Sequence, residues 1–183
     1  LREEKQTSLY IRAFEATAHA IVVTDAKGSI ISVNRAFTQL TGYSRDEALG
    51  QNPRILQSGR HEPTFYEQMW KTITATGHWH GDVWDRRKDG SIYPKYLSIS
   101  AIKNSSGALT NYVGIFFDNS ERHTLEERLD QLAHYDALTG LPNRSLLLDR
   151  MEQAVERAIR LGTKVGLIYL DLDHFKHVND SFG

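Results

Sequence analysis

Two aspartates one residue apart, Asp171 and Asp173, follow a run of apolar residues from Val165 to Leu170. Such a run predicts a strand that is buried on both faces. Carboxylates at the carboxyl end of a buried strand are well placed to hold a hard cation such as Mg2+. The same pair could instead only cap the helix that follows, and the local pattern taken alone favours this simpler interpretation.

The residues after the aspartates have types that suit a nucleotide. His174, Phe175 and Lys176 begin a predicted helix, whose free N–H groups and dipole favour a phosphate, and Lys176 adds a positive charge. Asn179 lies about one helical turn further on and carries both a donor and an acceptor for a base edge. Contacts to a metal, a phosphate and a base could therefore converge in this short segment.

The elements that precede this segment include a complete α+β domain. Residues 2–17 have the apolar spacing of a helix, and β-branched runs at 20–24 and 29–33 flank a turn that contains Gly28. Residues 34–77 predict several short helices and one longer helix, and 79–117 predict three more strands. Together they predict a five-stranded antiparallel sheet with helices on one face, and the space between these layers can hold a small ligand.

After Phe117 the pattern changes to that of a linker helix. Leu125, Leu129 and Leu132 recur at i, i+4 and i+7 and form one narrow apolar stripe. This stripe could rest on a neighbouring element or form a parallel coiled coil between two copies. The expected organisation is a flanking helix at 1–18, the sheet domain at 19–119, the linker helix at 120–136 and the start of a second, α/β domain at 137–183.

The composition excludes several classes of protein. The chain has 22 Lys and Arg against 23 Asp and Glu, a balance unlike that of a nucleic-acid-binding protein. It has no cysteine, which excludes disulfides, thiolate metal ligands and cysteine nucleophiles. No apolar run is long enough to span a membrane, so we expect a cytoplasmic location, with any membrane tether in other segments. The chain starts at Leu1 without a Met, and we expect it to be a piece of a longer protein.

Two motifs in the last third of the chain resemble the start of a GGDEF domain, the catalytic domain of diguanylate cyclases. They are Asp136-Ala-Leu-Thr-Gly-Leu-Pro-Asn-Arg144 and Leu170-Asp-Leu-Asp-His-Phe-Lys-His-Val-Asn-Asp-Ser-Phe-Gly183. The resemblance implies that the Asp171 side chain and the Leu172 carbonyl bind Mg2+. It implies that GTP is bound by His174, Phe175, Lys176 and Asn179.

The same resemblance gives Asp136 and Arg144 a place in the junction that couples the linker to the catalytic domain. The alternative is a simple salt bridge within the turn. The sequence ends before the Gly-Gly-Asp/Glu-Glu-Phe signature. We therefore expect no catalysis by the 183-residue chain itself, with Mg2+ and GTP used by the intact parent. The resemblance also admits an EAL phosphodiesterase domain further along that parent.

Residues 10–120 resemble a PAS domain. The resemblance is carried by Ile21-Val-Val-Thr-Asp25 with Gly28, Val33-Asn34-Arg-Ala-Phe37, Leu40-Thr-Gly-Tyr43, Asp46-Glu47, Gly50, Arg87-Lys-Asp-Gly90 and Val113-Gly114. Asp118-Asn119-Ser120 stands where PAS domains often carry an element that couples the last strand to the output helix. Asp118 and Ser120 are therefore candidate coupling residues, although an ordinary helix cap would have the same composition.

The ligand of this domain is left open by the sequence. Arg54 and Gln57 match positions that contact flavin in LOV domains, a branch of the PAS family, but the photoreactive cysteine of that branch would fall at Pro53. Asp85 and Lys95 stand where that branch has flavin-reading asparagines. The stretch Gly77-His-Trp79-His-Gly81 also resembles redox PAS domains that bind FAD. The candidate pocket residues are Arg54, Gln57, Trp79 and Asp85; core packing without a ligand is the default, flavin is the alternative and haem is not expected.

Three functions compete on these grounds. The expected one is a sensory PAS module that couples a signal or dimerisation to a diguanylate cyclase in a cyclic di-GMP signalling protein. The others are a ligand-free PAS dimerisation module with a degenerate output domain, and a flavin-binding redox or light sensor. We also expect a homodimer that forms through the helix around Leu9 and Phe14 and through the stripe of Leu125, Leu129 and Leu132.

Overall fold

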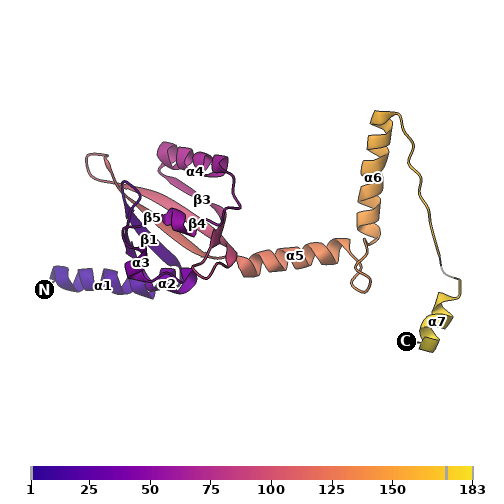
Figure 1. Ribbon diagram of the computed structural model, residues 1–183, viewed down its shortest axis with the longest axis horizontal. Coiled ribbons are helices and arrows are strands. Elements are labelled where there is room, and N and C mark those ends of the chain that lie inside the picture. Colours follow the sequence, from indigo (N-terminus) through magenta and orange to yellow (C-terminus); the bar gives the residue numbers. More distant parts are fainter. Residues whose placement is uncertain (1, 172, 183) are drawn as a thin grey trace. The chain divides into compact units, whose positions relative to one another are not determined.

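The computed structural model describes residues 2–171 and 173–182, which fall into two units, Leu1–Glu126 and Glu127–Gly183 (Figure 1). Leu172, the predicted carbonyl ligand of Mg2+, lies outside the described residues. No helix in the described part of the chain is both long and apolar enough to cross a bilayer.

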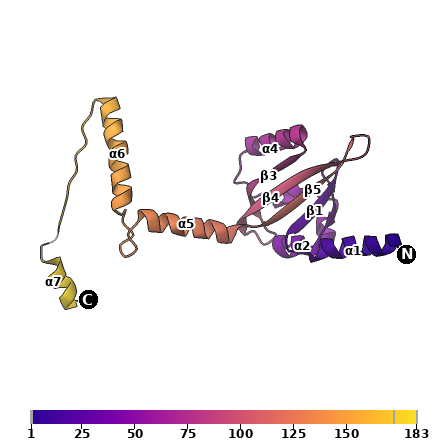
Figure 2. The same ribbon diagram turned by 180° about the vertical axis from the view of Figure 1, so that it is seen from behind.

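The first unit confirms the predicted five-stranded antiparallel sheet with helices (Figure 2). The strand order is β2-β1-β5-β4-β3, and every neighbouring pair is antiparallel. Its elements are α1 (Arg2–Ala16), β1 (Ala20–Asp25), β2 (Ile30–Val33), α2 (Arg35–Thr41), α3 (Arg45–Ala48), the 3-10 turn η1 (Pro53–Leu56), α4 (Pro63–Thr76), β3 (His78–Arg86), β4 (Ile92–Lys103) and β5 (Leu109–Asp118), followed by α5 (Ser120–His134).

Asp25 and Gly28 determine the conformation of the turn between β1 and β2. The Asp25 carboxylate accepts hydrogen bonds from the N–H groups of Lys27 and Ser29, both at 2.9 Å. Gly28 has a φ of 86°, which a residue with a side chain rarely adopts. The turn therefore follows from the Asp-x-x-Gly sequence, as predicted.

The core lies between one face of the sheet and the helices. In β1 buried residues alternate with half-buried ones, as a sheet with one covered face requires. Phe37 of α2 and Phe116 of β5 are almost fully buried, and their rings meet edge to face with centroids 5.9 Å apart. These contacts fix α2 on the same face that α4 covers through Met69 and Ile73.

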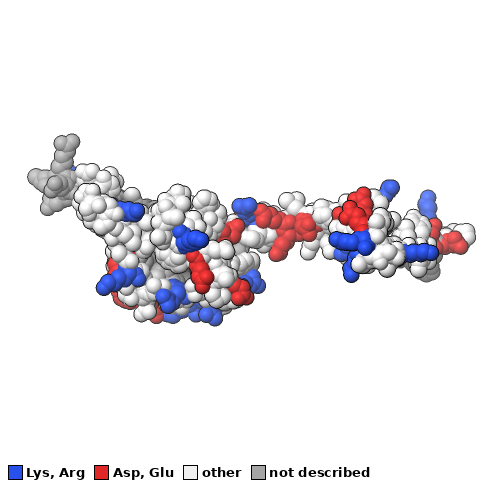
Figure 3. Space-filling view, turned by 90° about the horizontal axis from the view of Figure 1, so that it is seen from above, with Lys and Arg blue, Asp and Glu red and all other residues white. Residues whose placement is uncertain are grey.

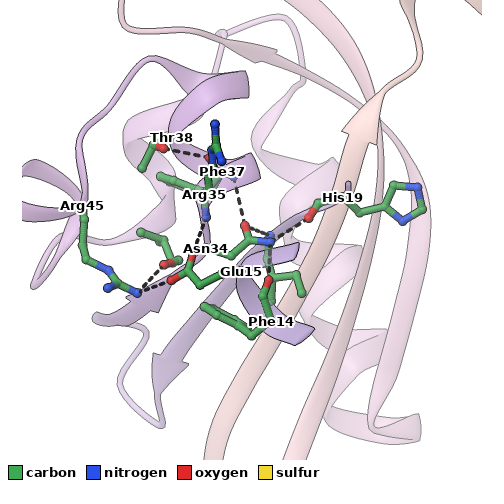
Figure 4. A network of polar contacts seen from close by, with 10 residues as sticks. Phe14, Glu15, His19, Asn34, Arg35, Phe37, Thr38 and Arg45 are labelled. Carbon is green, nitrogen blue, oxygen red and sulfur yellow. Dashed lines mark hydrogen bonds and ion pairs between the residues drawn. The ribbon is translucent and has the colours of Figure 1, made fainter. Parts of the chain in front are cut away.

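A single buried side chain, Asn34, joins α1, β1 and α2 (Figure 4). Its Oδ1 atom accepts hydrogen bonds from the N–H groups of Ile21 at 2.8 Å and Phe37 at 3.0 Å. Its Nδ2 atom donates to the carbonyls of Phe14 at 3.1 Å and His19 at 2.9 Å. Asn34 therefore uses both polar atoms and satisfies four backbone groups that the fold would otherwise leave without partners.

A charged contact beside Asn34 also holds the end of α1 (Figure 4). The Glu15 carboxylate accepts from the Arg35 N–H group at 2.8 Å and from the Arg45 guanidinium at 3.2 Å. Arg45 also donates to the Val33 carbonyl at 2.8 Å. The C-terminal end of α1 is therefore attached to both β2 and the two short helices.

The second unit contains α6 (Arg144–Leu161) and α7 (Phe175–Phe182). Asn143 caps α6, because its side chain accepts from the Leu146 N–H group at 3.1 Å, and Gly162 ends the helix with a φ of 64°.

The prediction of a buried strand at 165–170 is wrong. The structure has no strand there, and Ile168 and Leu170 are 84% and 87% exposed. A strand needs neighbours for its backbone N–H and C=O groups, and the described residues of this unit contribute no other strand.

Replacement of Asn34 by alanine should lower the free energy of unfolding by about 2–4 kcal/mol, because it leaves four backbone groups without partners, in buried and partly buried hydrogen bonds. Urea unfolding followed by tryptophan fluorescence measures this, since Trp70, Trp79 and Trp84 all lie in the first unit. Asn104→Ala is the matched control: Asn104 bonds only within its own exposed turn, so the loss should stay below about 1 kcal/mol. Equal losses in the two variants would contradict the role given to Asn34.

Candidate functional site

A cavity of about 540 Å3 lies between the sheet and the segments η1 and α4. This volume is within the range of ordinary small-molecule sites. Most of its wall is apolar, and it includes Val22, Leu56, Met69, Val83, Leu97 and Phe116. The predicted space between sheet and helices is therefore present and is large enough for a ligand.

An ion pair between Asp85 and Lys95 forms part of the cavity wall. Asp85 lies opposite Tyr93 in the β3–β4 ladder, so Lys95, two residues further along β4, is its diagonal neighbour on the same face. The two residues are only 3% and 4% exposed. The Lys95 ammonium also lies 4.1 Å from the centre of the Phe116 ring.

Burial acts on both members of this pair. It raises the pKa of Asp85 above its usual range, although the neighbouring Lys95 ammonium opposes the shift. It lowers the pKa of Lys95, with Asp85 opposing. Both shifts have the same cause, since a medium that solvates charge poorly favours the neutral form of each group.

The predicted pocket residues do not all reach the cavity. Arg54, Gln57 and Asp85 line it, as does Pro53. Trp79 lies outside the lining and packs edge to face against Phe65, with ring centroids 6.0 Å apart. The flanking His78 and His80 are exposed, in keeping with the alternation of side chains along β3.

Tyr66 is a cavity residue that the sequence reasoning missed. It lies on α4, and its buried hydroxyl has no hydrogen-bond partner among the described residues. Burial and the charge of Asp85 raise the pKa of this hydroxyl. The helical spacing of the sequence could have indicated Tyr66. It lies three residues before Met69, so the two side chains share one face of the helix.

The segment between η1 and α4 covers the free edge of β3. Gln57 forms a β-bridge with Asp85, and the Ser58 hydroxyl donates to the Trp84 carbonyl. The Nε2 atom of His61 accepts from the Trp84 N–H group at 2.8 Å. Side chains of this segment therefore take the place of a sixth strand.

The candidate coupling residues Asp118 and Ser120 meet at the start of α5. One oxygen of Asp118 accepts from the Ser120 N–H group at 2.8 Å, and the other lies 2.5 Å from the Arg87 guanidinium. Arg87 also donates to the Leu40 carbonyl at the end of α2 and stacks 3.7 Å from the centre of the Tyr93 ring. Burial alone would raise the pKa of Asp118, but these hydrogen bonds outweigh it and the pKa lies below the ordinary value.

The residue after Arg87 ties the same turn to α2 and α3. The Lys88 N–H group donates to the Thr41 carbonyl at 2.9 Å, and the Lys88 ammonium lies 2.5 Å from Glu47. The hydrogen bond from Lys88 is the main reason that the pKa of Glu47 falls to about 2. At Gly42, where φ is 78°, a Cβ atom would lie 3.3 Å from the Lys88 side chain. The β3–β4 turn therefore contacts both the helical cover and the start of α5.

The residues that the GGDEF resemblance implies do not form an enclosed site in the described part of the chain. Asp171, Asp173, His174, Phe175, Lys176 and Asn179 are exposed, and no described His, Asp or Glu residues form a group of three that could hold a metal ion. The Asp136 carboxylate accepts from the N–H and hydroxyl groups of Thr139 at 2.9 and 2.7 Å. Arg144 begins α6 and is exposed.

The model of the PAS domain matches residues 18–121. The chain belongs to the PAS domain family. Further along the chain, the model described as "Diguanylate cyclase, GGDEF domain" matches residues 133–183.

This PAS protein is similar to several named proteins. A nitrogen fixation regulatory protein of Klebsiella oxytoca is 32% identical over 154 residues, which are 83% of this chain and 31% of that protein. The bifunctional diguanylate cyclase/cyclic di-GMP phosphodiesterase MucR of Pseudomonas aeruginosa is 54% identical over 87 residues, 48% of this chain and 12% of MucR. Among solved structures, an RNA-binding Light-Oxygen-Voltage receptor superposes with a TM-score of 0.63 at 29% identity, over 69% of this chain and 36% of that one. The chain thus spans about a third or less of these curated relatives.

A double-mutant cycle with Arg87→Met and Asp118→Asn should show a coupling of about 1 kcal/mol by urea unfolding, because the pair is only partly exposed. The Asp118 carboxylate should contribute its stability at neutral pH and lose it as the pH falls through its lowered pKa, since protonation removes the charge that Arg87 contacts. The exposed pair Arg122–Glu126 is the control, with a coupling below about 0.5 kcal/mol. Additive effects of Arg87→Met and Asp118→Asn would contradict a stabilising interaction between these two side chains.

Proposed function

We propose that this chain is the sensory and linker part of a cyclic di-GMP signalling protein, in which the PAS domain regulates a diguanylate cyclase (GGDEF) domain. The observation that carries the proposal is the connection between two family matches. A PAS domain with an internal cavity has its last strand clamped to the first turn of α5, and residues that match a GGDEF domain follow. The similarity to MucR, a named diguanylate cyclase, supports the same output.

The regulatory step runs through Arg87 in this proposal. Phe116 lines the cavity and packs against Phe37 of α2, and α2 ends at the Leu40 carbonyl that Arg87 contacts. A change in the cavity that shifts α2 therefore alters the contact between Arg87 and Asp118. Because Asp118 caps α5, that contact biases the start of the output helix.

The catalytic residues in this proposal are those that the GGDEF resemblance implies. Asp171 and the Leu172 carbonyl would hold Mg2+, which supplies charge neutralisation during phosphoryl transfer. The GTP contacts would come from His174, Phe175, Lys176 and Asn179, with Asp136 and Arg144 at the junction. Among the described residues no three His, Asp or Glu side chains form a group that could hold a metal ion. The surface of the first unit carries both basic and acidic side chains on the face shown in Figure 3, and the proposal involves no nucleic acid.

The test uses the full-length gene product that contains this chain. Formation of cyclic di-GMP from GTP and Mg2+ should differ at least several-fold between the wild type and Arg87→Met, because the variant frees the start of α5. Arg122→Met, which removes an exposed contact on the same helix, should behave as the wild type. No cyclic di-GMP turnover in the wild type, neither synthesis nor hydrolysis, would contradict the function; equal rates in all three proteins would contradict the route through Arg87.

A flavin sensor is the second candidate. The similarity to the Light-Oxygen-Voltage receptor favours it, and Arg54 and Gln57 line the cavity where such a ligand would lie. The buried pair of Asp85 and Lys95 disfavours it, because these side chains replace flavin-reading asparagines. A visible absorption spectrum of the purified protein separates the two candidates, and we expect a colourless protein.

A homodimer would bring two output domains together. On α5 the side chains of Leu125, Leu129 and Leu132 are 59%, 65% and 55% exposed, and on α1 Leu9 is 62% exposed. Burial of each leucine would contribute about 1.5–3 kcal/mol, enough in total to offset an association cost of several kcal/mol. We therefore place the contact between two copies along these helices, whereas Phe14 is half-buried and bonds to Asn34 through its carbonyl.

Leu129→Asp should convert the dimer to a monomer in light scattering, since it would bury an unpaired charge in the contact. Gln131→Asp adds the same charge at an exposed position of α5 outside the leucine stripe and should leave the dimer intact. The dimer model fails if the wild type is a monomer or if Leu129→Asp remains dimeric.

A further inference from the structure

Lys95 is a buried amine in the wall of the cavity, and the proposed signalling route leaves it without a role. Lysine is almost never fully buried unless it is paired. Here the pairing is with a single carboxylate, that of Asp85, and both side chains face the same 540 Å3 space. A nucleophilic group is therefore held beside a proton acceptor in an apolar chamber.

Burial weakens the preference of this pair for its charged form. Burial lowers the pKa of Lys95 and raises that of Asp85. A proton can pass from the Lys95 Nζ atom to the Asp85 carboxylate within the existing contact, which leaves a neutral amine next to a carboxylic acid. A lysine whose ammonium form is disfavoured by burial is the type that attacks carbonyl compounds.

We propose that Lys95 binds an apolar aldehyde covalently, as an imine within the PAS cavity. The proposal rests on the geometry of the Lys95–Asp85 pair and on the apolar wall that surrounds it. It deepens the proposed sensory function, because it names the ligand class that would occupy the sensor, and it rests on that function only for its biological meaning.

The reaction needs no oxidant or reductant. The Lys95 nitrogen forms a bond to the aldehyde carbon while the π electrons of the C=O bond move to oxygen. Two proton transfers through Asp85 convert this adduct to a neutral carbinolamine. Asp85 then protonates the hydroxyl, which leaves as water as the nitrogen lone pair forms the C=N bond. The products are a protonated imine, one water molecule and the Asp85 carboxylate.

The product keeps the electrostatics of the starting structure. The cavity wall holds one positive and one negative charge before the reaction, and the protonated imine and Asp85 carry the same two charges afterwards. A neutral, apolar aldehyde therefore adds no unpaired charge to the interior. A charged aldehyde would add one and is disfavoured.

Tyr66 fits this chemistry as a positioning residue. Tyr66 lines the same cavity, and its hydroxyl is buried and has no partner among the described residues. The carbonyl oxygen of a bound aldehyde would accept a hydrogen bond from it, and the negative charge that develops on that oxygen strengthens the bond. Tyr66 would therefore gain the partner that it lacks.

The test uses hydrocinnamaldehyde as the probe, with sodium cyanoborohydride to trap an imine as a stable amine on the purified protein. Peptide mass mapping should place the adduct on Lys95 at a rate at least about tenfold above that of Lys27, an exposed lysine at the same cavity. Hydrocinnamyl alcohol, which has the same shape without the carbonyl, should slow the labelling by competition. Labelling of exposed lysines with Lys95 unmodified would overturn the proposal.

Variants add a second readout. Tyr66→Phe keeps the aromatic packing and should slow the labelling of Lys95 about tenfold, by loss of one donor to the developing charge. Lys95→Met should abolish the adduct at position 95 and leave the adduct on Lys27 unchanged. Lys88→Met, which removes a surface lysine, should leave the adduct on Lys95 unchanged. Mapping of the wild type gives the decision even if Lys95→Met does not fold. Because no cyclic di-GMP is measured, failure here leaves the signalling function standing, and failure of that function leaves this result standing.

Discussion

The four hydrogen bonds of Asn34 are the interaction on which the first unit depends. Through them a single amide fixes the end of α1, the start of β1 and the first turn of α2. The position of α2 in turn sets Phe37 against Phe116 and places the Leu40 carbonyl within reach of Arg87. A buried amide with every atom satisfied specifies one arrangement of these elements, because any other would leave polar groups unpaired in the core. The cavity and the clamp at α5 both follow from that arrangement.

The β3–β4 turn gives this arrangement a connection to the output helix. Arg87 reaches α2, Tyr93 and Asp118, while Lys88 reaches the end of α2 and Glu47 of α3. These contacts come from two adjacent residues of a tight turn, so they move together. Polar contacts of this kind are partly exposed and individually weak. Their value to a sensor is that small energies can be reversed by the binding of a small ligand.

Much of the fold could be predicted from local patterns, and the reason is visible at single residues. The Asp25 and Gly28 turn, the Asn143 cap and the alternation of β3 depend on neighbours in the sequence. The buried strand at 165–170 failed because a strand depends on partners elsewhere in the chain, which an apolar run does not report. The cavity residues divide in the same way: Arg54, Gln57 and Asp85 were indicated by resemblance, whereas the place of Tyr66 depends on tertiary packing. The contacts of Arg87, outside the cavity, also depend on tertiary packing. Trp79 was also indicated by resemblance, yet packing places it outside the lining.

The segment that covers the edge of β3 also forms part of the cavity wall. Ser58 and His61 occupy the carbonyl and N–H group of Trp84, and Gln57 pairs with Asp85. An uncovered strand edge is a template for pairing with other chains. Gln57 also lines the cavity, so the segment that guards the edge is part of the cavity wall. If this segment moved away, the backbone N–H and C=O groups of Trp84 would be left unpaired at the edge of β3. Infrequent opening of this segment would therefore keep the edge of β3 from pairing with other chains.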